Sequence, residues 1–399
     1  MESIKELLKI GNGPSSSHTM GPARAALKFL EKNPTANNFV VTLYGSLAAT
    51  GKGHLTDEII LRTLGRNRTK IIFDHDLVYS YHPNGMKLEA YKDQEMVDSW
   101  LVFSVGGGSL KELNETRDSF TEEIYPQKTM HDILEYCKLE NINLYEYVIR
   151  HEEGDFTKYL KDILKTMFEA INRGLFTNGT LPGGLNVERR ASHVYNEYLL
   201  NPSFSTLVYA ASLAVAEENA SGGVIVTAPT CGASGVLPAV LYAEKIYNGV
   251  EEDKLIEALC VAGLIGNLVK TNGSISGAEV GCQGEVGVAC AMAAAAITHI
   301  KNGTNNEIEY AAEIGLEHHL GMTCDPIDGL VQIPCIERNA MAAMQAHNCA
   351  KYSLLTKGVH LITLDDAIEV MEQTGKDLRE EYRETSKGGL AYRRIKNGK

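Results

Sequence analysis

Three cysteines, Cys282, Cys324 and Cys335, lie in two glycine- and proline-rich stretches of this chain, GAEVGCQGEVG and GMTCDPIDGLVQIPC. They are spaced 42 and then 11 residues apart. Thiolates held in glycine-rich backbone suit iron–sulfur clusters, because small residues let main-chain N–H groups approach the sulfides and tune the cluster. Three thiolate ligands rather than four would leave one iron open for chemistry. A fold that uses these cysteines as ligands must bring the two glycine-rich stretches together.

The alternative is that the three cysteines are ordinary buried thiols, since free cysteine is among the most buried residue types. A cysteine used as a small hydrophobic residue usually lies inside an apolar helical pattern, as Cys260 and Cys290 do in KLIEALCVAGLIGNLV and VGVACAMAAAAI. The three loop cysteines border turns instead. None of the compact CxxC signatures is present, so the spacing alone leaves both interpretations open.

The first part of the chain has the periodicity of a small α+β domain. GPARAALKFLEK has helical spacing, whereas NFVVTLYGSLA, TKIIFDH, GMKLEAY and SWLVFSVGGG are rich in β-branched and aromatic residues and are separated by turn signals. We therefore expect an α+β fold class, with a small N-terminal α+β domain that spans residues 1–150.

The remainder, 151–399, is expected to form a larger, predominantly α-helical domain. Two amphipathic helices within 130–173 lead into it, and their apolar faces favour a homodimer. The last segment, 375–399, is polar and basic and is predicted to form a solvated helix and a mobile tail. Three glycine-rich loops interrupt the alanine-rich helical sequence, and a functional site is expected where rigid helices position such loops: 219–235, 272–287 and 321–334.

Composition argues against several classes of function. The formal charge is −13, from 51 acidic and 38 basic residues, which disfavours nucleic acid or an anionic membrane surface as a partner and favours a small-molecule substrate. The N-terminus lacks a basic region followed by an apolar core, and the longest apolar run is shorter than the roughly 20 residues that a membrane span requires. Eight cysteines without a signal sequence indicate reduced thiols, so we expect a cytoplasmic protein.

Two histidine motifs stand out in the first domain. In GPSSSHT, Ser15, Ser17 and His18 precede a helical segment, so their hydroxyl and N–H groups could bind a carboxylate near a helix N-terminus. An ordinary helix N-cap explains the same residues. In GKGHLTDE, His54 could serve as a general base because imidazole titrates near working pH. A surface histidine at the start of a helix is the alternative there.

Seven segments, in order along the chain, resemble the iron–sulfur L-serine dehydratases of bacteria. The resemblance covers nearly the whole chain, and its motifs are long and unlike those of other families. It implies a 4Fe–4S cluster on Cys282, Cys324 and Cys335, and the deamination of L-serine to pyruvate and ammonia by an L-serine ammonia-lyase. The segments are GPSSSHTMGP (13–22), GKGHLTDE (51–58), HPNGM (82–86), LPGGLNVERRA (181–191), ENASGGVIVTAPT (218–230), SGAEVGCQGEVGVAC (276–290) and CDPIDGLVQIPCIERNAM (324–341).

With this resemblance, the histidine and serine motifs acquire roles in one reaction. Elimination of water from serine requires loss of the α-proton and departure of hydroxide, and an iron with an open site can act as a Lewis acid on the β-hydroxyl. Our hypothesis is that His54 is the base that takes the α-proton and that His18 is a second catalytic residue. Substrate binding is assigned to polar residues of the motif loops: Ser15, Ser17, Asn219, Ser276 and Arg338.

Arg338 is a candidate carboxylate clamp, because guanidinium pairs bidentately with carboxylates, although an arginine that forms a salt bridge on its own helix is the alternative.

Some relatives end in a cysteine that reaches the fourth iron, whereas this chain ends in NGK. Cys231, in APTCGAS, occupies a position where many relatives resemble APTNG, and it is predicted to be a spare thiol near the site.

Three rival functions are compatible with parts of the sequence. A pyridoxal-phosphate dehydratase would catalyse the same reaction, and SVGGGSL at 104–110 resembles a phosphate-cradling loop, but no lysine stands in a persuasive Schiff-base context. A cluster-dependent L-cysteine desulfidase would expel sulfide in place of water. An iron–sulfur redox sensor or electron carrier is disfavoured by the acidic charge and by the three-ligand pattern.

Overall fold

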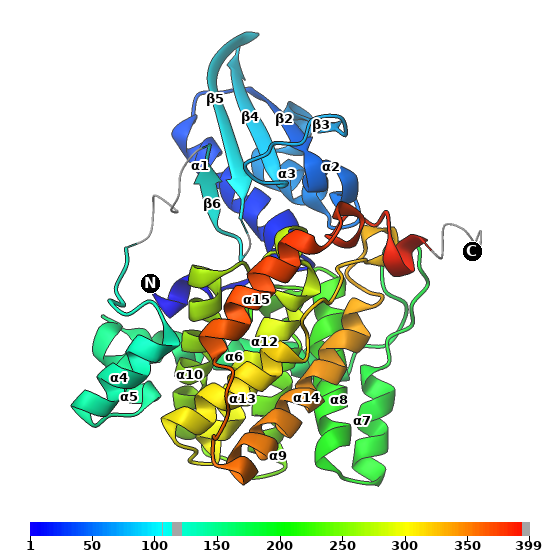
Figure 1. Cartoon of the computed structure of the whole chain (residues 1–399). Helices are drawn as coiled ribbons and strands as arrows, with labels where there is room; N and C mark the ends of the chain where they lie inside the picture. Colours follow the sequence, from blue (N-terminus) through cyan, green and yellow to red (C-terminus); the bar gives the residue numbers. More distant parts are fainter. Residues whose placement is uncertain (106, 114–121, 393–399) are drawn as a thin grey trace.

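The computed structural model describes residues 1–105, 107–113 and 122–392, in which a small sheet domain stands on a larger helical domain (Figure 1). This arrangement confirms the expected α+β class. The elements of the small domain are α1 (Gly21–Lys32), β2 (Asn38–Tyr44), α2 (Gly45–Thr50), α3 (Thr56–Leu64), β3 (Thr69–Asp74), β4 (Gly85–Lys92), β5 (Glu95–Ser104) and β6 (Leu110–Glu112). The five strands form one sheet with the order β3-β2-β4-β5-β6, in which only the β2–β3 pair is parallel.

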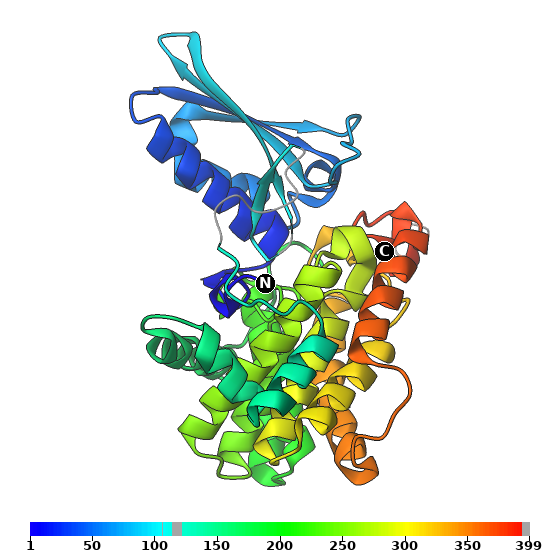
Figure 2. The ribbon, with the colours of Figure 1, turned by 60° about the vertical axis from the view of Figure 1, so that its left-hand side comes forward.

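The sheet has one buried face because its strands alternate with a period of two. Phe39, Val41 and Leu43 of β2 are buried, and Leu88 lies opposite Val41 on β4. α1 and α3 lie against this face (Figure 2) and add Phe29 and other apolar residues to the same core cluster. The predicted first helix and the predicted strands are therefore confirmed over most of their lengths, but residues 45–48 of the run NFVVTLYGSLA begin α2 and the run SWLVFSVGGG leaves the strand after Ser104.

The helical domain is built around α12, every residue of which is buried. Its alanines let neighbouring helices approach closely: a Cβ on Gly315 of α13 would lie only 3.0 Å from Ala291 Cα of α12. α10 and α14 also pack on α12. The helices of this domain are α4 (Met130–Glu140), α5 (Leu144–His151), α6 (Phe156–Leu175), α7 (Ala191–Leu200), α8 (Phe204–Ala220), α9 (Val236–Ile246), α10 (Glu252–Asn272), α11 (Gly277–Val280), α12 (Val286–Ile300), α13 (Asn305–Glu317), α14 (Cys335–Thr356) and α15 (Leu364–Asp377).

α10 is long and apolar enough to cross a membrane when length and composition alone are considered. However, 78% of its most apolar window is buried inside the fold, as expected of a core helix. A second pair of segments, 277–283 and 286–300, meets the same criterion only if it is counted as one span, and it is bent by 52°. The apolar character of these helices follows from their packing in the described core.

The N-terminal segment joins the two domains. Ile4, Leu7 and Leu8 are fully buried in the helical core, together with residues of α4 and α5. β1 (Ile10–Asn12) then pairs antiparallel with β7 (Val224–Val226) before the chain enters the small domain. The predicted division at residue 150 stays a prediction, and the packing adds that residues 1–8, α4 and α5 contribute to the larger core.

Replacing Ile4 by alanine should destabilise the helical domain. The Ile4 side chain is 0% exposed and fills the space above Gly263, where a Cβ would lie 2.3 Å from Ile4 Cγ2. Truncation of such a side chain typically lowers the free energy of unfolding by about 2–5 kcal/mol. Ile10→Ala is the matched control, because Ile10 is 45% exposed. Urea unfolding of both variants checks this prediction, and equal midpoints would contradict it.

The C-terminal segment differs from the predicted solvated helix and mobile tail. α15 ends at Asp377, and the chain then returns to the domain junction through a 3-10 turn, Glu380–Tyr382. The Cys324 N–H donates to the Tyr382 carbonyl over 2.8 Å, and the Glu384 N–H donates to the Cys324 carbonyl over 2.8 Å. The prediction is wrong for 378–391, which these backbone hydrogen bonds and the burial of Glu384 and Ala391 hold in place. Residues 393–399 lie outside the described part.

Candidate functional site

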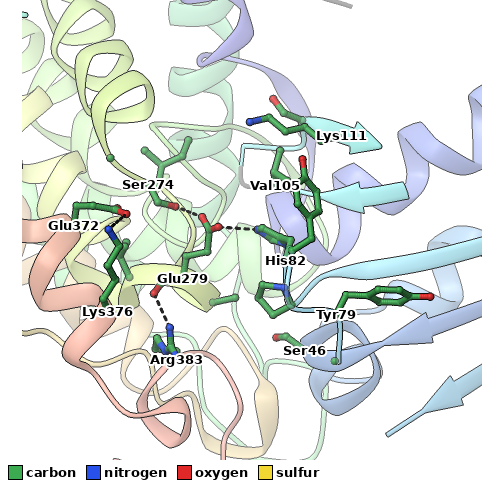
Figure 3. Close-up of a pocket in the computed structure, with 18 of the residues that line it drawn as sticks. Ser46, Tyr79, His82, Val105, Lys111, Ser274, Glu279, Glu372, Lys376 and Arg383 are labelled. Carbon is green, nitrogen blue, oxygen red and sulfur yellow. Dashed lines mark hydrogen bonds and ion pairs between the residues drawn. The ribbon is translucent and has the colours of Figure 1, made fainter. Parts of the chain in front are cut away.

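A cavity of about 1450 Å³ lies at the junction of the two domains. Ser46, Tyr79 and His82 line it from the sheet domain, and Ser274, Glu279 and Arg383 line it from the helical domain (Figure 3). Ser46 also contacts a buried group of polar residues behind the cavity wall, because its hydroxyl lies 3.1 Å from His18 Nε2. The cavity therefore borders this buried group, which is the candidate site.

The three loop cysteines come together on one side of the site. Cys282 follows α11 in a 3-10 turn, Cys324 lies in the loop before α14, and Cys335 is the first residue of α14. Cys282 Sγ, Cys324 Sγ and a Glu285 carboxylate oxygen all lie within 4.8 Å of one another. Cys335 is near enough to Cys282 for their charges to interact. All three thiols are buried and free.

The surroundings of these thiols fit a metal cluster. A Cβ on Gly277 would lie 2.6 Å from Glu285 Oε2 and 3.1 Å from Cys324 Sγ, so the backbone approaches the sulfur closely only because this residue is glycine. The hydrogen bond with Cys282, burial, and neighbouring carboxyls raise the pKa of Cys324 well above its usual value. Burial followed by the charge of Cys282 does the same to Cys335. A bound metal ion has the opposite effect: it lowers the pKa of a coordinating thiol and keeps it as a thiolate.

The GPSSSHT motif forms the second wall of the site. Ser15 caps a π-helical turn, Ser16–Met20, and its hydroxyl accepts from the His18 N–H over 3.1 Å. Ser17 Oγ lies 3.0 Å from His18 Nδ1. The Ser46 hydroxyl donates to the Glu384 carbonyl, so it accepts from His18 Nε2–H, and Nδ1 is then the unprotonated nitrogen of His18. Burial, and then the neighbouring His54, lower the pKa of His18 well below its usual value.

His54 packs against His18, with ring centroids 4.4 Å apart. Its Nδ1 lies 3.1 Å from the Thr50 carbonyl, which can only accept, so Nδ1 carries the hydrogen and Nε2 presents a lone pair. Nε2 is buried and has no hydrogen-bond partner among the described residues. Burial lowers the pKa of His54 to about 4. His54 is thus a neutral base that is shielded from solvent, and the predicted alternative of a surface histidine is wrong because its side chain is 0% exposed.

Glu384 is a site residue that the sequence did not indicate. It is 5% exposed, and its Oε1 lies 3.5 Å from His18 Nδ1 and 3.7 Å from His54 Nε2. Burial, followed by the charges of Glu285 and Cys282, raises the pKa of the Glu384 carboxyl well above its usual value. No local sequence pattern in the polar C-terminal segment indicates this residue, because its position depends on backbone hydrogen bonds with the distant Cys324.

The structure also brings the predicted Asn219 and Ser276 to the site. The Asn219 side chain donates to the Pro14 carbonyl over 2.9 Å, which ties the serine-rich loop to the end of α8. Its Oδ1 is buried without a partner among the described residues, and the same holds for Ser276 Oγ, next to Gly277. Buried polar atoms without protein partners are uncommon in folded proteins and are expected where a ligand or water binds.

The Arg338 guanidinium is paired with neighbouring residues of the chain, and is not free to bind a substrate carboxylate as predicted. Its guanidinium donates to the Thr323 carbonyl over 2.6 Å and pairs with Asp325 at 3.2 Å, and it also contacts Cys282. These contacts fix the loop that carries Cys324. Glu285, three residues after Cys282, accepts from Thr230 Oγ1 over 2.8 Å.

Two further residues are clarified by the structure. Cys231 is buried beside Met20, with its Sγ 3.4 Å from the Met20 sulfur, and burial raises the pKa of its thiol. It is not within the group formed by Cys282, Glu285 and Cys324. His82 also belongs to the cavity wall: it is 3% exposed, and its Nε2 faces Glu279 Oε1 at 3.4 Å (Figure 3).

Comparison with known proteins yields matches along nearly the whole chain. Residues 86–391 match the family model described as serine dehydratase alpha chain, and residues 3–70 match the model described as serine dehydratase beta chain. L-serine dehydratase 1 of Escherichia coli is 39% identical, with 98% of this chain and 99% of the relative aligned. L-serine dehydratases of Haemophilus influenzae and Streptomyces coelicolor are 38% and 39% identical, with 100% and 98% of this chain aligned.

Proposed function

We propose that this chain, which belongs to the serine dehydratase family, converts L-serine to pyruvate and ammonia by β-elimination of water with a 4Fe–4S cluster as Lewis acid. The observation that carries the proposal is the juxtaposition of three buried thiols with two buried, neutral histidines. L-serine dehydratase activity itself follows from the high identity to L-serine dehydratases over almost the full length.

Cys282, Cys324 and Cys335 would hold the cluster. When bound, it would supply an open iron that stabilises negative charge on the departing hydroxide. The chain's own contribution to this part of the site is the packing that keeps solvent out and the loop geometry that Arg338 maintains through Thr323 and Asp325. The chemistry of the donor set supports this assignment, because three soft thiolates suit an iron–sulfur cluster and leave one iron for another ligand.

His54 is assigned as the base that removes the α-proton at Nε2. Its protonated Nδ1 is anchored on the Thr50 carbonyl, so the lone pair of Nε2 points away from the backbone into the site. Two hydroxyls orient the loops around it, since Thr19 Oγ1 donates to the His54 carbonyl over 2.7 Å and Thr56 Oγ1 donates to the His18 carbonyl over 2.6 Å. His18 completes the pair and orients the hydroxyl of Ser17.

Substrate binding is assigned to the polar groups that line the same space. Ser15 and Ser17 lie at the start of the π-helical turn, where hydroxyl groups and the positive end of the turn favour the substrate carboxylate. Asn219 and Ser276 supply polar atoms that have no hydrogen-bond partner within the described part of the chain. Arg338 is also proposed to bind the substrate carboxylate. Its hydrogen bonds to Thr323 and Asp325, however, favour a role in holding the loop that carries Cys324.

The pH dependence of kcat/KM should reflect the buried base. Because the pKa of His54 is lowered from 6.5 to about 4, the imidazole stays neutral and competent well below pH 6.5. Between about pH 7.5 and about pH 5.5, kcat/KM should therefore fall less than about twofold, whereas an ordinary histidine would lose about tenfold. Returning each sample to pH 7.5 controls for loss of the cluster. An acid limb centred near pH 6.5 would contradict the prediction.

The function is tested by incubating the anaerobically purified, iron-loaded protein with L-serine and, separately, with L-cysteine. The proposal predicts pyruvate from L-serine at a much higher kcat/KM than pyruvate and sulfide from L-cysteine. A preference for L-cysteine would establish a desulfidase instead, and the absence of either reaction would point to a non-enzymatic role such as redox sensing.

We also propose a cytoplasmic location and a homodimer. The acidic composition and the reduced thiols support the first, and exposed apolar residues of the helical domain support the second: Leu139, Phe176, Leu199 and Leu200.

A further inference from the structure

Glu384 adopts a conformation that points its carboxyl into the site. Its φ of 57° lies in the left-handed region, which residues with a Cβ rarely adopt. The backbone is held there from both domains: the N–H donates to the Cys324 carbonyl over 2.8 Å, and the carbonyl accepts from Ser46 Oγ over 3.2 Å. Strain that is held in place at a buried polar residue suggests a functional role for that side chain.

The carboxyl faces acceptors and no donors. Glu384 Oε1, His18 Nδ1 and His54 Nε2 all lie within 4.8 Å of one another. Both histidine nitrogens are unprotonated, because the opposite nitrogen of each ring donates to Ser46 or to the Thr50 carbonyl. Among the described residues, no lysine or arginine forms an ion pair with Glu384. His18 Nδ1 accepts from the Ser17 hydroxyl, but Glu384 Oε1 and His54 Nε2 face each other at 3.7 Å without a donor among the described residues, so this pair favours a ligand that is cationic and carries N–H groups, or a metal ion.

An ammonium group fits this arrangement better than a metal ion does. It carries three donors and no acceptor, and its positive charge favours the ionised form of a buried carboxyl, with which it forms charge-assisted hydrogen bonds. The lone pair of His18 Nδ1 already has the Ser17 hydroxyl within 3.0 Å, which leaves an incomplete ligand set for a metal. Glu285, the half-buried carboxyl beside the thiols, is engaged with Thr230 and Cys324, so Glu384 is the carboxyl of the site that is left for a ligand.

We infer that Glu384 binds the α-ammonium group of L-serine and thereby selects amino acids over hydroxy acids. The inference rests on the proposed function and deepens it. The ammonium and the proton that His54 removes are bonded to the same carbon, so their partners must be neighbours, as Glu384 and His54 are at 3.7 Å. The C-terminal segment, which closes over the loop of Cys324, supplies this substrate-binding residue.

The test compares two unreactive ligands, L-alanine and propanoate, which differ only by the ammonium group. Their dissociation constants are measured by anaerobic calorimetry with the cluster-loaded full chain and its Glu384→Gln variant, which keeps the side-chain shape and removes the charge. We expect the wild type to bind L-alanine at least about tenfold more tightly than propanoate, and the variant to bind both within about threefold. Because neither ligand reacts, the result is independent of whether the protein forms pyruvate from L-serine.

Two further variants keep the test decisive. Glu384→Asp retains the charge and should restore part of the preference for L-alanine, which a purely structural role would not explain. Glu381→Gln, three residues earlier and partly exposed, should leave the ratio unchanged. The inference is overturned if Glu384→Gln weakens both ligands equally, if it changes neither, or if metal analysis finds a divalent ion held by His18, His54 and Glu384 in addition to the cluster iron.

Discussion

Replacement of Cys282, Cys324 or Cys335 by serine should remove iron and activity together. All three thiols are buried, and the surroundings of Cys324 and Cys335 raise their pKa, so the ionised thiolates are favoured only when a metal binds them. Loss of an outer-shell partner already reduces metal-site function by about 10–100-fold, so loss of a ligand should reduce pyruvate formation to below about one hundredth of wild type. Iron and sulfide content per chain, measured on anaerobic protein, provides the readout.

Cys231→Ala is the sharpest control for this experiment. Cys231 is as deeply buried as the three loop cysteines and lies near Glu285, but its sulfur contacts Met20 rather than another thiol. The variant should load iron normally and retain most activity. A Cys335→Ser protein with a full complement of iron, or a Cys231→Ala protein without iron, would show that the ligand set is assigned wrongly.

Replacement of His54 by alanine should lower kcat by about 10²–10⁴ while the cluster content stays unchanged. The reason is that Nε2 is the unpartnered base of the site, and the nearest other imidazole, His18, has its free lone pair turned toward Ser17. The affinity for L-alanine should change little, because the proposed ammonium partner is Glu384. Anaerobic pyruvate assays combined with iron analysis check both statements.

His131→Ala serves as the matched control for His54→Ala, since His131 is exposed on α4. It should retain wild-type kcat. Full activity of His54→Ala would refute the assignment of the base, and loss of iron in that variant would show that His54 supports the cluster rather than the proton transfer.

Much of the fold could be predicted because its signals are local. The apolar residues of β2 and β4 alternate in the sequence, and this pattern predicts one buried sheet face. The unbroken apolar run of α12 likewise predicts a fully buried helix. The glycine-rich loops around Cys282 and Cys324 could be recognised for the same reason. Their convergence depends on long-range packing, and only the three-dimensional arrangement adds Glu285 and Thr230 to them.

The part of the site that could not be predicted depends on long-range pairing. Residues 375–399 are polar and basic, which is typical of an exposed tail, yet two backbone hydrogen bonds to Cys324 hold Glu384 in the site. The left-handed conformation of Glu384 carries no signal in the sequence, because glycine or asparagine would be expected there. The sequence predicts a carboxylate clamp at Arg338, whereas its contacts with Thr323 and Asp325 are visible only in the folded chain.

The central claim is that a cluster held by the three loop cysteines carries out the dehydration of L-serine. The most direct measurement is the rate of pyruvate formation from L-serine by anaerobic, iron-loaded protein beside an identical aliquot exposed to air. The account predicts that activity is lost in air and returns when iron, sulfide and a reductant are added anaerobically. Activity that is indifferent to air, and that persists after iron is removed, would contradict it and point to a pyridoxal-phosphate enzyme.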